Sequence, residues 1–437
     1  MKKMVVAALL MVLPVLMFAA DEKKGPEFSW KGEFRTRYNS QTSGTTSDIF
    51  KDGANVSDRF DTRFRLFTTA KLSDQVKAVW GLEIGDFEWG SGDRSSDMVN
   101  IETKHLYIDF APDFAPSMMV RIGLQPILDP FNSAIFDEDA PGIVVMPKIE
   151  NFDFSVGMVV YQDDDVAKKL KLSDKLKVST DGGNAAARNV FFTQGIYKAD
   201  ALKIKGAFYY DKTSKVNVGT NDIVNLYFGA GLDYKTGDMT FGANYILNSY
   251  TSKESVETSE DVFEDYTRSG SLLYAFADYK KDKFNAKLHF GYTPGKDYSS
   301  NDSTEGSGYA GIKEFTSVYG LEYLYGGAVY DTTGYYAYNY GGDLGQMVIA
   351  LNLSYDWIYT SVGIVNCTFT EAEGSDIGKG FGTEFDFGIK KDLTKGLEFR
   401  MVYAIASPGS YFNDMGDAFD IETATDHELS AIFKYKF

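Results

Sequence analysis

The chain has 437 residues and is acidic, with 62 Asp and Glu residues against 44 Lys and Arg and a formal net charge of -18. This balance argues against a nucleic-acid-binding protein, which would carry a basic surface. The counts of 33 Phe, 29 Tyr and 42 Gly, against 10 Pro and 1 Cys, fit aromatic belts and tight sheet geometry better than an ordinary globular core. The composition therefore favours a β-sheet protein with much polar surface in water.

The first twenty residues have the pattern of a secretory signal peptide. The pattern consists of two basic residues, an apolar run and two small residues, at Lys2 and Lys3, Met4–Phe18, and Ala19 and Ala20. We expect cleavage after Ala20 or one residue earlier. We expect residues 21–437 to form a single domain, because they contain no domain boundary or helical repeat. No later segment has the roughly 18 consecutive apolar residues of a membrane helix.

Polar and apolar residues alternate along much of the chain. The clearest early segment sets Arg59, Asp61, Arg63 and Arg65 against Phe60, Phe64 and Leu66. Comparable alternation recurs over residues 33–38, 75–84, 202–211, 284–292, 347–355, 381–389 and 397–405. Such segments have about the length of a tilted membrane strand, in which one side faces lipid and the other faces water. One such segment would also fit a soluble sheet, but the repetition favours a transmembrane β-barrel.

Short turns and long polar connections alternate between these segments. The short turns fall at residues 72–75, 235–238, 280–283 and 391–396, and the long connections at 88–100, 162–187, 252–266, 294–311 and 407–423. This asymmetry is typical of outer-membrane barrels, whose short turns face the periplasm. We therefore predict an all-β fold, an antiparallel transmembrane barrel of about 18 strands, with 16 as the next choice. Residues 315–344 fit either one large loop or an extra hairpin.

The chain ends in a strand pattern that finishes on an aromatic residue. Phe433, Tyr435 and Phe437 lie on one side of this strand, and Lys434 and Lys436 lie on the other. The pattern is similar to the closing strand of bacterial outer-membrane proteins, whose terminal aromatic residue is read by the barrel-insertion machinery. We expect this strand to close the barrel, so that no strand edge faces lipid.

Residues 121–147 interrupt the repeating strand pattern. A strand begins at Arg121 and is broken at Pro126, and the acidic run Asp137, Glu138 and Asp139 follows. We predict a loop over Gln125–Pro141, third among the outer connections, which folds into the lumen and narrows a pore. We predict a returning strand over Gly142–Ile149. A solvated loop is the alternative interpretation of the acidic run.

Six arginines share the polar side of their strands and would point into the lumen of a closed barrel: Arg35, Arg37, Arg59, Arg63, Arg65 and Arg121. If the acidic run faces them, opposed guanidinium and carboxylate groups would set an electric field across the pore and penalise apolar solutes. Alternatively, these arginines are polar lumen residues paired with Asp61 or Glu33.

The run from Asp58 to Asp165 resembles the homotrimeric outer-membrane porins of sulfate-reducing and related bacteria, a branch of the general-diffusion porins. The resemblance is carried by DRFDTRFRL, LEIGDFEWG, VNIETKHLYIDF, RIGLQ and FDEDAPGIVV. It implies passive transport, assembly as a homotrimer and a third extracellular loop folded inward as the constriction. Residues 250–345 do not match, so the strand number and loop roles there rest on the alternation alone.

Other chemistry finds little support in the sequence. The acidic cluster Asp163, Asp164 and Asp165 lacks the spacing of a known calcium loop and fits a solvated outer loop. His105, His289 and His427 are far apart, and Cys367 fits a buried or lipid-facing thiol. No serine-hydrolase elbow, phosphate-binding loop or metalloprotease helix occurs. We therefore expect no catalytic residue, metal or cofactor.

The sequence predicts an outer-membrane porin, a water-filled channel for passive diffusion of small hydrophilic solutes. Its expected partners are outer-membrane lipids, the insertion machinery and two further copies of the chain. Two alternatives stay open. One is a substrate-selective channel for sugars or carboxylates, and the other is a non-conducting surface structural or adhesion barrel.

Overall fold

The computed structural model describes most of the chain after the predicted signal peptide. The described residues are 25–42, 50–53, 56–88, 101–161, 188–213, 223–253, 265–297, 305–307, 309, 319–325, 344–370, 377–419 and 422–437. The acidic cluster at residues 163–165 and the predicted signal peptide lie outside this part.

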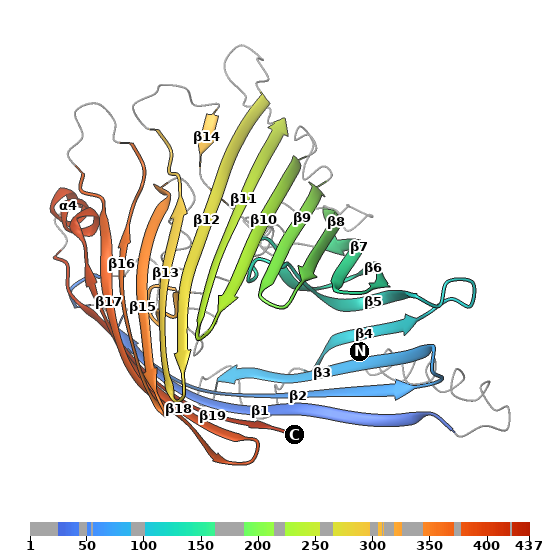
Figure 1. Ribbon diagram of the computed structural model, residues 1–437. Coiled ribbons are helices and arrows are strands. Elements are labelled where there is room, and N and C mark those ends of the chain that lie inside the picture. Colours follow the sequence, from blue (N-terminus) through green and yellow to red (C-terminus); the bar gives the residue numbers. More distant parts are fainter. Residues whose placement is uncertain are drawn as a thin grey trace, which may run out of the picture.

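The strands form a closed antiparallel barrel of 18 strands, as the sequence predicted (Figure 1). The first nine are β1 (Glu27–Thr42), β2 (Val56–Lys71), β3 (Val76–Glu88), β4 (Ile101–Phe110), β5 (Met118–Leu128), β6 (Asp137–Ile149), β7 (Phe152–Tyr161), β8 (Arg188–Lys198) and β9 (Leu202–Thr213). The others are β10 (Ile223–Thr236), β11 (Met239–Lys253), β12 (Asp265–Lys281), β13 (Phe284–Thr293), β15 (Gln346–Tyr355), β16 (Ile358–Asn366), β17 (Gly380–Thr394), β18 (Leu397–Pro408) and β19 (Asp426–Lys436).

Each barrel strand pairs with its neighbours in chain order, and β1 pairs with β19 to complete the ring. The short strand β14 (Glu305–Ser307) pairs in parallel with Thr267–Ser269 of β12 and is not part of the barrel ring. In the ring, β13 pairs directly with β15. Of residues 315–344, the described ones are 319–325 and 344, and none belongs to a strand. The extra hairpin considered for this region is therefore absent from its described part.

The alternation read from the sequence separates the two faces of the wall. On β1, Phe34 is 42% exposed on the outer face, whereas Arg35 and Arg37 are buried in the interior at 5% and 4% exposure. The outer face of the barrel is apolar and rich in aromatic residues, and charged and amide groups gather inside. A soluble protein has the opposite arrangement, with apolar residues inside. An apolar outer face is what a lipid environment favours.

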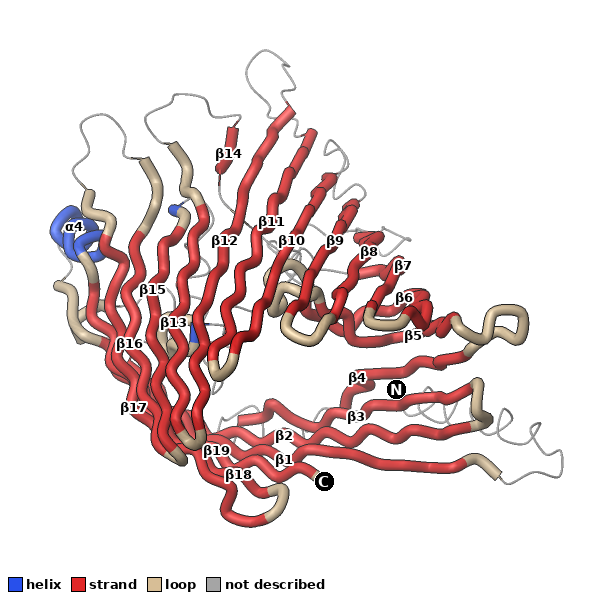
Figure 2. The backbone as a smooth tube through the Cα atoms, viewed as in Figure 1, coloured by secondary structure: helices blue, strands red, loops and turns tan. Residues whose placement is uncertain are grey.

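The two ends of the barrel differ in their connections (Figures 1 and 2). At one end the strands are joined by tight turns, in which Asn151, Asp282 and Asp356 have positive φ values of 59°, 51° and 58°. Asn and Asp tolerate this left-handed conformation better than most residues. At the other end lie the long connections, including the helix α4 (Ser410–Phe419) between β18 and β19. Within the described residues, no helix is long and apolar enough to cross a membrane.

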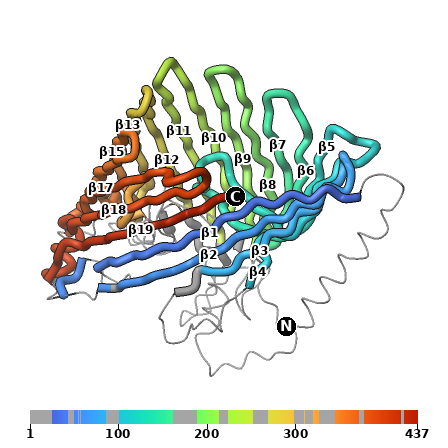
Figure 3. Tube along the Cα trace, turned by 90° about the horizontal axis from the view of Figure 1, so that it is seen from below, coloured from blue at the N-terminus to red at the C-terminus, as the bar shows by residue number. Residues whose placement is uncertain are grey.

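The closing strand lies where the sequence placed it, with Phe433, Tyr435 and Phe437 exposed on the outer face. In the view of Figure 3, β19 lies directly beside β1. The backbone of Phe437 exchanges two hydrogen bonds with Gly32, at 2.9 and 3.1 Å. Its ring lies over Gly32, where an added Cβ atom would be 2.4 Å from the ring and 2.7 Å from the Arg65 carbonyl oxygen.

We expect Gly32→Val to weaken barrel closure, because the new side chain must displace both the Phe437 ring and the strand. Overpacking of this kind costs about 1–3 kcal/mol. The unfolding temperature, followed by heat-modifiable migration on detergent gels, should fall by several degrees. Gly206→Val on β9 is the matched control, since an added Cβ there meets nothing within 4 Å. Equal behaviour of the two variants would contradict the role assigned to Gly32.

Candidate functional site

The hairpin formed by β5 and β6 leaves the barrel wall partway along its length. β4 pairs with β5 only as far as Leu106 and Leu124, and β6 begins to pair with β7 at Gly142. Beyond these points, in the described sheet, Gln125–Leu128 and Asp137–Ala140 pair only with each other. We call Gln125–Pro141 the inner hairpin.

Two glycines stand opposite each other where the inner hairpin departs. Gly123 pairs with Gly142 across the hairpin, and Gly123 has a φ of 129°. A Cβ atom at Gly123 would lie 2.2 Å from the Leu106 carbonyl oxygen, and one at Gly142 would lie 2.2 Å from that of Met158. Because these contacts are with backbone atoms, the neighbouring strands cannot easily give way, and glycine is required on both strands.

The tip of the inner hairpin, residues 129–136, folds around one buried carboxylate. Asp129 accepts hydrogen bonds from the backbone N–H groups of Phe131 (2.6 Å), Ile135 (2.5 Å) and Phe136 (2.9 Å). Burial nevertheless raises the pKa of Asp129 to about 6, against the opposing effect of the three donors. Asn132 and Ser133 take positive φ values of 63° and 64°, which allow the tight tip.

The tip packs against inward-facing side chains of β7 to β11. The Phe131 ring lies on Gly229 of β10, where an added Cβ would be 2.2 Å from the ring. The surrounding apolar cluster includes Val159, Val190, Phe192, Tyr209, Tyr227 and Ile246. The Tyr309 hydroxyl also donates to the Ala134 carbonyl oxygen at 2.6 Å. In Figure 2 this connection extends from β5 and β6 behind β9 and β10.

The acidic run does not belong to a loop, and that prediction was wrong. Asp137, Glu138 and Asp139 begin β6 and pair with the end of β5, so the connection is only residues 129–136. The reason is that Pro126 does not stop the strand, because it lies on an edge that has no wall partner, and it still pairs with Asp139. The returning strand likewise starts before Gly142 and includes Pro141.

Asp139 is bound to β4 across the gap that the inner hairpin leaves in the wall. Its carboxylate lies 2.8 Å from the Lys104 Nζ atom and 2.9 Å from the His105 Nε2 atom. Lys104 also lies 3.9 Å from Glu83 on β3. Asp139 therefore contacts residues of β4, and not the six arginines that the sequence had suggested as its partners.

Carboxylates on the inner wall pair with arginines that the sequence singled out. Arg35 and Arg37 both reach Asp61, at 3.5 and 2.7 Å, Arg63 reaches Glu33 at 3.0 Å, and Arg65 pairs with Glu83. Arg121 forms two hydrogen bonds with Asp109, at 2.6 and 2.9 Å, and lies over the Tyr107 ring. Arg59 lies on the same inner side of β2, with its side chain half-buried. Arg35, Arg37 and Arg63 thus have the partners that the paired interpretation named, whereas Arg65 and Arg121 pair with other acids of the wall.

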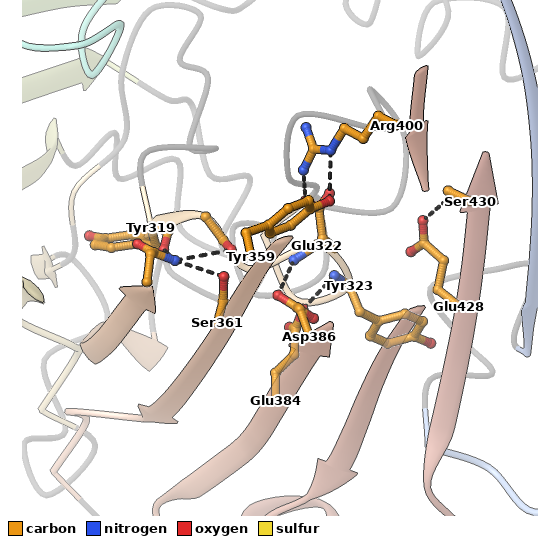
Figure 4. Close-up of polar contacts among 12 residues, drawn as sticks. Tyr319, Glu322, Tyr323, Tyr359, Ser361, Glu384, Asp386, Arg400, Glu428 and Ser430 are labelled. Carbon is orange, nitrogen blue, oxygen red and sulfur yellow. Dashed lines mark hydrogen bonds and ion pairs between the residues drawn. The ribbon is translucent and has the colours of Figure 1, made fainter. Parts of the chain in front are cut away.

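A second segment of the interior, Tyr319–Tyr325, is fastened to the wall by carboxylates (Figure 4). Glu384 of β17 accepts the consecutive backbone N–H groups of Tyr323 and Leu324, each at 2.7 Å. Asp426 of β19 accepts the Tyr323 hydroxyl, also at 2.7 Å. Wall carboxylates therefore take the place of a strand partner for this irregular backbone.

The same segment carries its own charge and several apolar side chains. Glu322 pairs with Arg400 of β18, whose Nε atom also donates to the Tyr359 hydroxyl at 2.7 Å. Leu321 lies on Gly363, where an added Cβ would be 2.4 Å away, and it is fully buried. These side chains join a large cluster with β15 to β18. We call Tyr319–Tyr325 the inner segment.

Sequence reasoning did not single out Glu384, Asp386, Asp426 and Glu428, which all lie buried inside the barrel. A signal existed, since Glu384 and Asp386 alternate with Phe385 and Phe387 on β17. These inward carboxylates have no basic residue near them in the sequence. Such a pattern indicates that their hydrogen-bond donors come from a distant part of the chain. Among the described residues, no group of His, Cys, Asp or Glu side chains is arranged to hold a metal ion.

Comparison with known proteins identifies the fold. No family model matches the sequence, and no curated protein matches it either. Solved structures do match, among them OccK8 (OprE) of Pseudomonas aeruginosa, with a TM-score of 0.54 and 10% identity over 94% of this chain and 98% of that one. This chain has the fold of the outer-membrane porins.

Two further porin-fold structures from Pseudomonas aeruginosa agree. OccK9 (OpdG) has a TM-score of 0.54 and 11% identity, and OpdQ has a TM-score of 0.51 and 13% identity. Each comparison covers 94% of this chain and 98% of the other. At these identities the porin fold is what the chains share. The resemblance to the porins of sulfate-reducing bacteria is not part of this result.

Asp129 provides a pH test of the inner hairpin. Because its pKa is raised from 3.8 to about 6, ionisation costs the closed tip up to about 3 kcal/mol. The stabilisation from the protonated form is complete below pH 4 and is lost as the pH rises through 6. We therefore expect the amides of Phe131, Ile135 and Phe136 to be better protected at pH 5 than at pH 8, after correction for intrinsic exchange.

Hydrogen-exchange mass spectrometry of the tip peptide measures this difference. In Asp129→Ala the three amides lose their acceptor, so protection should fall at both pH values and its dependence on pH should disappear. Asp113→Ala is a matched control, because Asp113 lies in an exposed turn at the other end of β5. A pH dependence that survives in Asp129→Ala would assign the effect to another group.

Proposed function

We propose that this protein is an outer-membrane porin through which small hydrophilic solutes diffuse passively. The observation that carries the proposal is the closed 18-stranded barrel, with an apolar outer face and a charged interior. Such a wall suits lipid outside and water inside. The proposal includes export by a signal peptide over residues 1–20, a single barrel domain over residues 21–437, and a passive role without catalysis.

The pore lies, in this proposal, along the inner faces of β1 to β5. The inner hairpin and the inner segment pack against the other parts of the wall, on β7 to β11 and β15 to β18. Along β1 to β4 the interior carries charged side chains of both signs that keep some contact with solvent, among them Glu33, Arg65 and Lys104. Alternating charges favour hydrated polar solutes over apolar ones.

The inner hairpin is the proposed constriction, and the long connections are proposed to face the outside of the cell. The acidic side of the constriction is then Asp139, held by Lys104 and His105. The basic side is formed by the paired arginines of β1, β2 and β5. Assembly as a homotrimer follows from the resemblance of residues 58–165 to trimeric porins.

A substrate-selective channel is the second candidate. The observation that favours it is that two separate segments pack inside the barrel, which leaves less of its cross-section for solutes. Conductance of the purified protein in a planar bilayer separates the candidates. Steady, unsaturated steps support a general porin, saturable block by one solute class supports a selective channel, and absence of conductance would reject both.

Arg65 tests which charges line the pore. Its guanidinium group pairs with Glu83, which also lies 3.9 Å from the Lys104 Nζ atom on β4. Arg63→Ala combined with Arg65→Ala should leave Glu33 and Glu83 without these partners, so the reversal potential in a salt gradient should shift toward cations. Lys71→Ala, in an exposed ion pair with Asp74 at the barrel rim, should shift it much less. An unchanged reversal potential would remove both arginines from the pore lining.

A further inference from the structure

A cavity of about 840 Å³ lies between the inner hairpin and the short-turn end of the barrel. Its walls come from the end of β5 and the hairpin tip, the β6–β7 turn, and the adjoining ends of β7 and β8. This volume is within the range of small-molecule sites, roughly 300–1,000 Å³. A solute that has passed the inner hairpin would reach this cavity before leaving the barrel.

One side of the cavity is apolar. Met119, Leu128, Met146 and Ile196 contribute to it, and Leu128 keeps 54% of its surface exposed although it lies on the inner hairpin. Methionine side chains adapt to ligands of different shape. The Leu128 backbone is fixed, because its carbonyl oxygen accepts the Gln194 amide at 2.9 Å. The apolar side is therefore presented to the lumen on a supported backbone.

The rim of the cavity carries charges of both signs. Lys148 lies near the end of β6 and Glu150 lies in the β6–β7 turn, and both are exposed. Asp153, also at the rim, is paired with Lys198. The fourth ionisable residue of the lining, Asp129, is buried and is held by backbone N–H groups of the tip, so Lys148 and Glu150 are the exposed lining charges for which the described residues provide no ion-pair partner. A cation and an anion two residues apart thus stand beside an apolar surface.

We propose that this cavity binds a small zwitterion with an apolar side chain, of the chemical class of the neutral amino acids. The solute carboxylate lies toward Lys148, its ammonium group toward Glu150, and its side chain against Leu128 and Met146. The inference rests on the proposed pore function, since the pore supplies the solute. It goes beyond that function, because a general porin has no binding site for a particular class of solute.

Equilibrium dialysis of the detergent-solubilised full chain tests binding without requiring conductance. Norleucine and glycine share the zwitterionic head and differ in the butyl side chain, so norleucine should bind at least fivefold more tightly. Hexanoate and hexylammonium each lack one charge and should bind more weakly than norleucine. Equal binding of norleucine and glycine would overturn the apolar subsite, and equal binding of hexanoate or hexylammonium would overturn the zwitterion assignment.

Variants locate the site. Leu128→Ser should abolish the preference for norleucine over glycine, and Lys148→Gln should weaken the binding of both. Lys395→Gln, an exposed lysine in another turn at the same end, should leave both affinities unchanged. If Lys395→Gln lowers the affinities as much as Lys148→Gln does, the binding is not at this cavity.

Planar-bilayer conductance of the same preparations separates this inference from the proposed function. Open conductance with no preference for norleucine contradicts the subsite and leaves the porin intact. Norleucine binding without conductance supports the subsite and contradicts the porin.

Discussion

The whole structure depends on the closure of the sheet between β1 and β19. Lipid offers no hydrogen-bond partner, so a sheet in a membrane cannot leave an edge of unpaired N–H and C=O groups. The register from Glu33–Lys436 to Gln41–Glu428 removes that edge. The aromatic end of the chain belongs to the same junction, because the Phe437 ring covers Gly32 while its backbone extends the ladder. Closure turns the alternation of each strand into an inside and an outside.

Once the interior is closed, its polar groups must find partners within it. On β1, β2, β3 and β5 they do so across neighbouring strands, as Arg121 does with Asp109. On β17 and β19 the partners come from a distant part of the chain, since Glu384 and Asp426 accept donors from the inner segment. Because buried carboxylates are costly without hydrogen-bond donors, this part of the wall and the inner segment stabilise each other.

The inner hairpin begins as part of the wall and then leaves it. It is continuous with β5 and β6 but has no ladder with β4 or β7, and apolar packing on side chains of β7 to β11 replaces the wall hydrogen bonds. The glycine pair Gly123 and Gly142 permits the departure, and Asp129 shapes the tip. The same departure opens the space below the hairpin that forms the cavity near Leu128. The inner hairpin and the cavity therefore both result from the same departure from the wall.

The sequence by itself predicted a barrel of about 18 strands, with 16 as the next choice, and a closing strand at residues 433–437. It also predicted the inward side of the strands that alternate clearly, because a period of two along a strand is a local property. It also located the interruption at Gln125–Pro141. Only the tertiary structure decided that Asp137, Glu138 and Asp139 belong to a strand, that Asp139 binds Lys104 and His105, and that wall carboxylates hold Tyr319–Tyr325. These features join residues that are far apart in the chain, and alternation gives the side on which a residue lies but not the residue that it meets there.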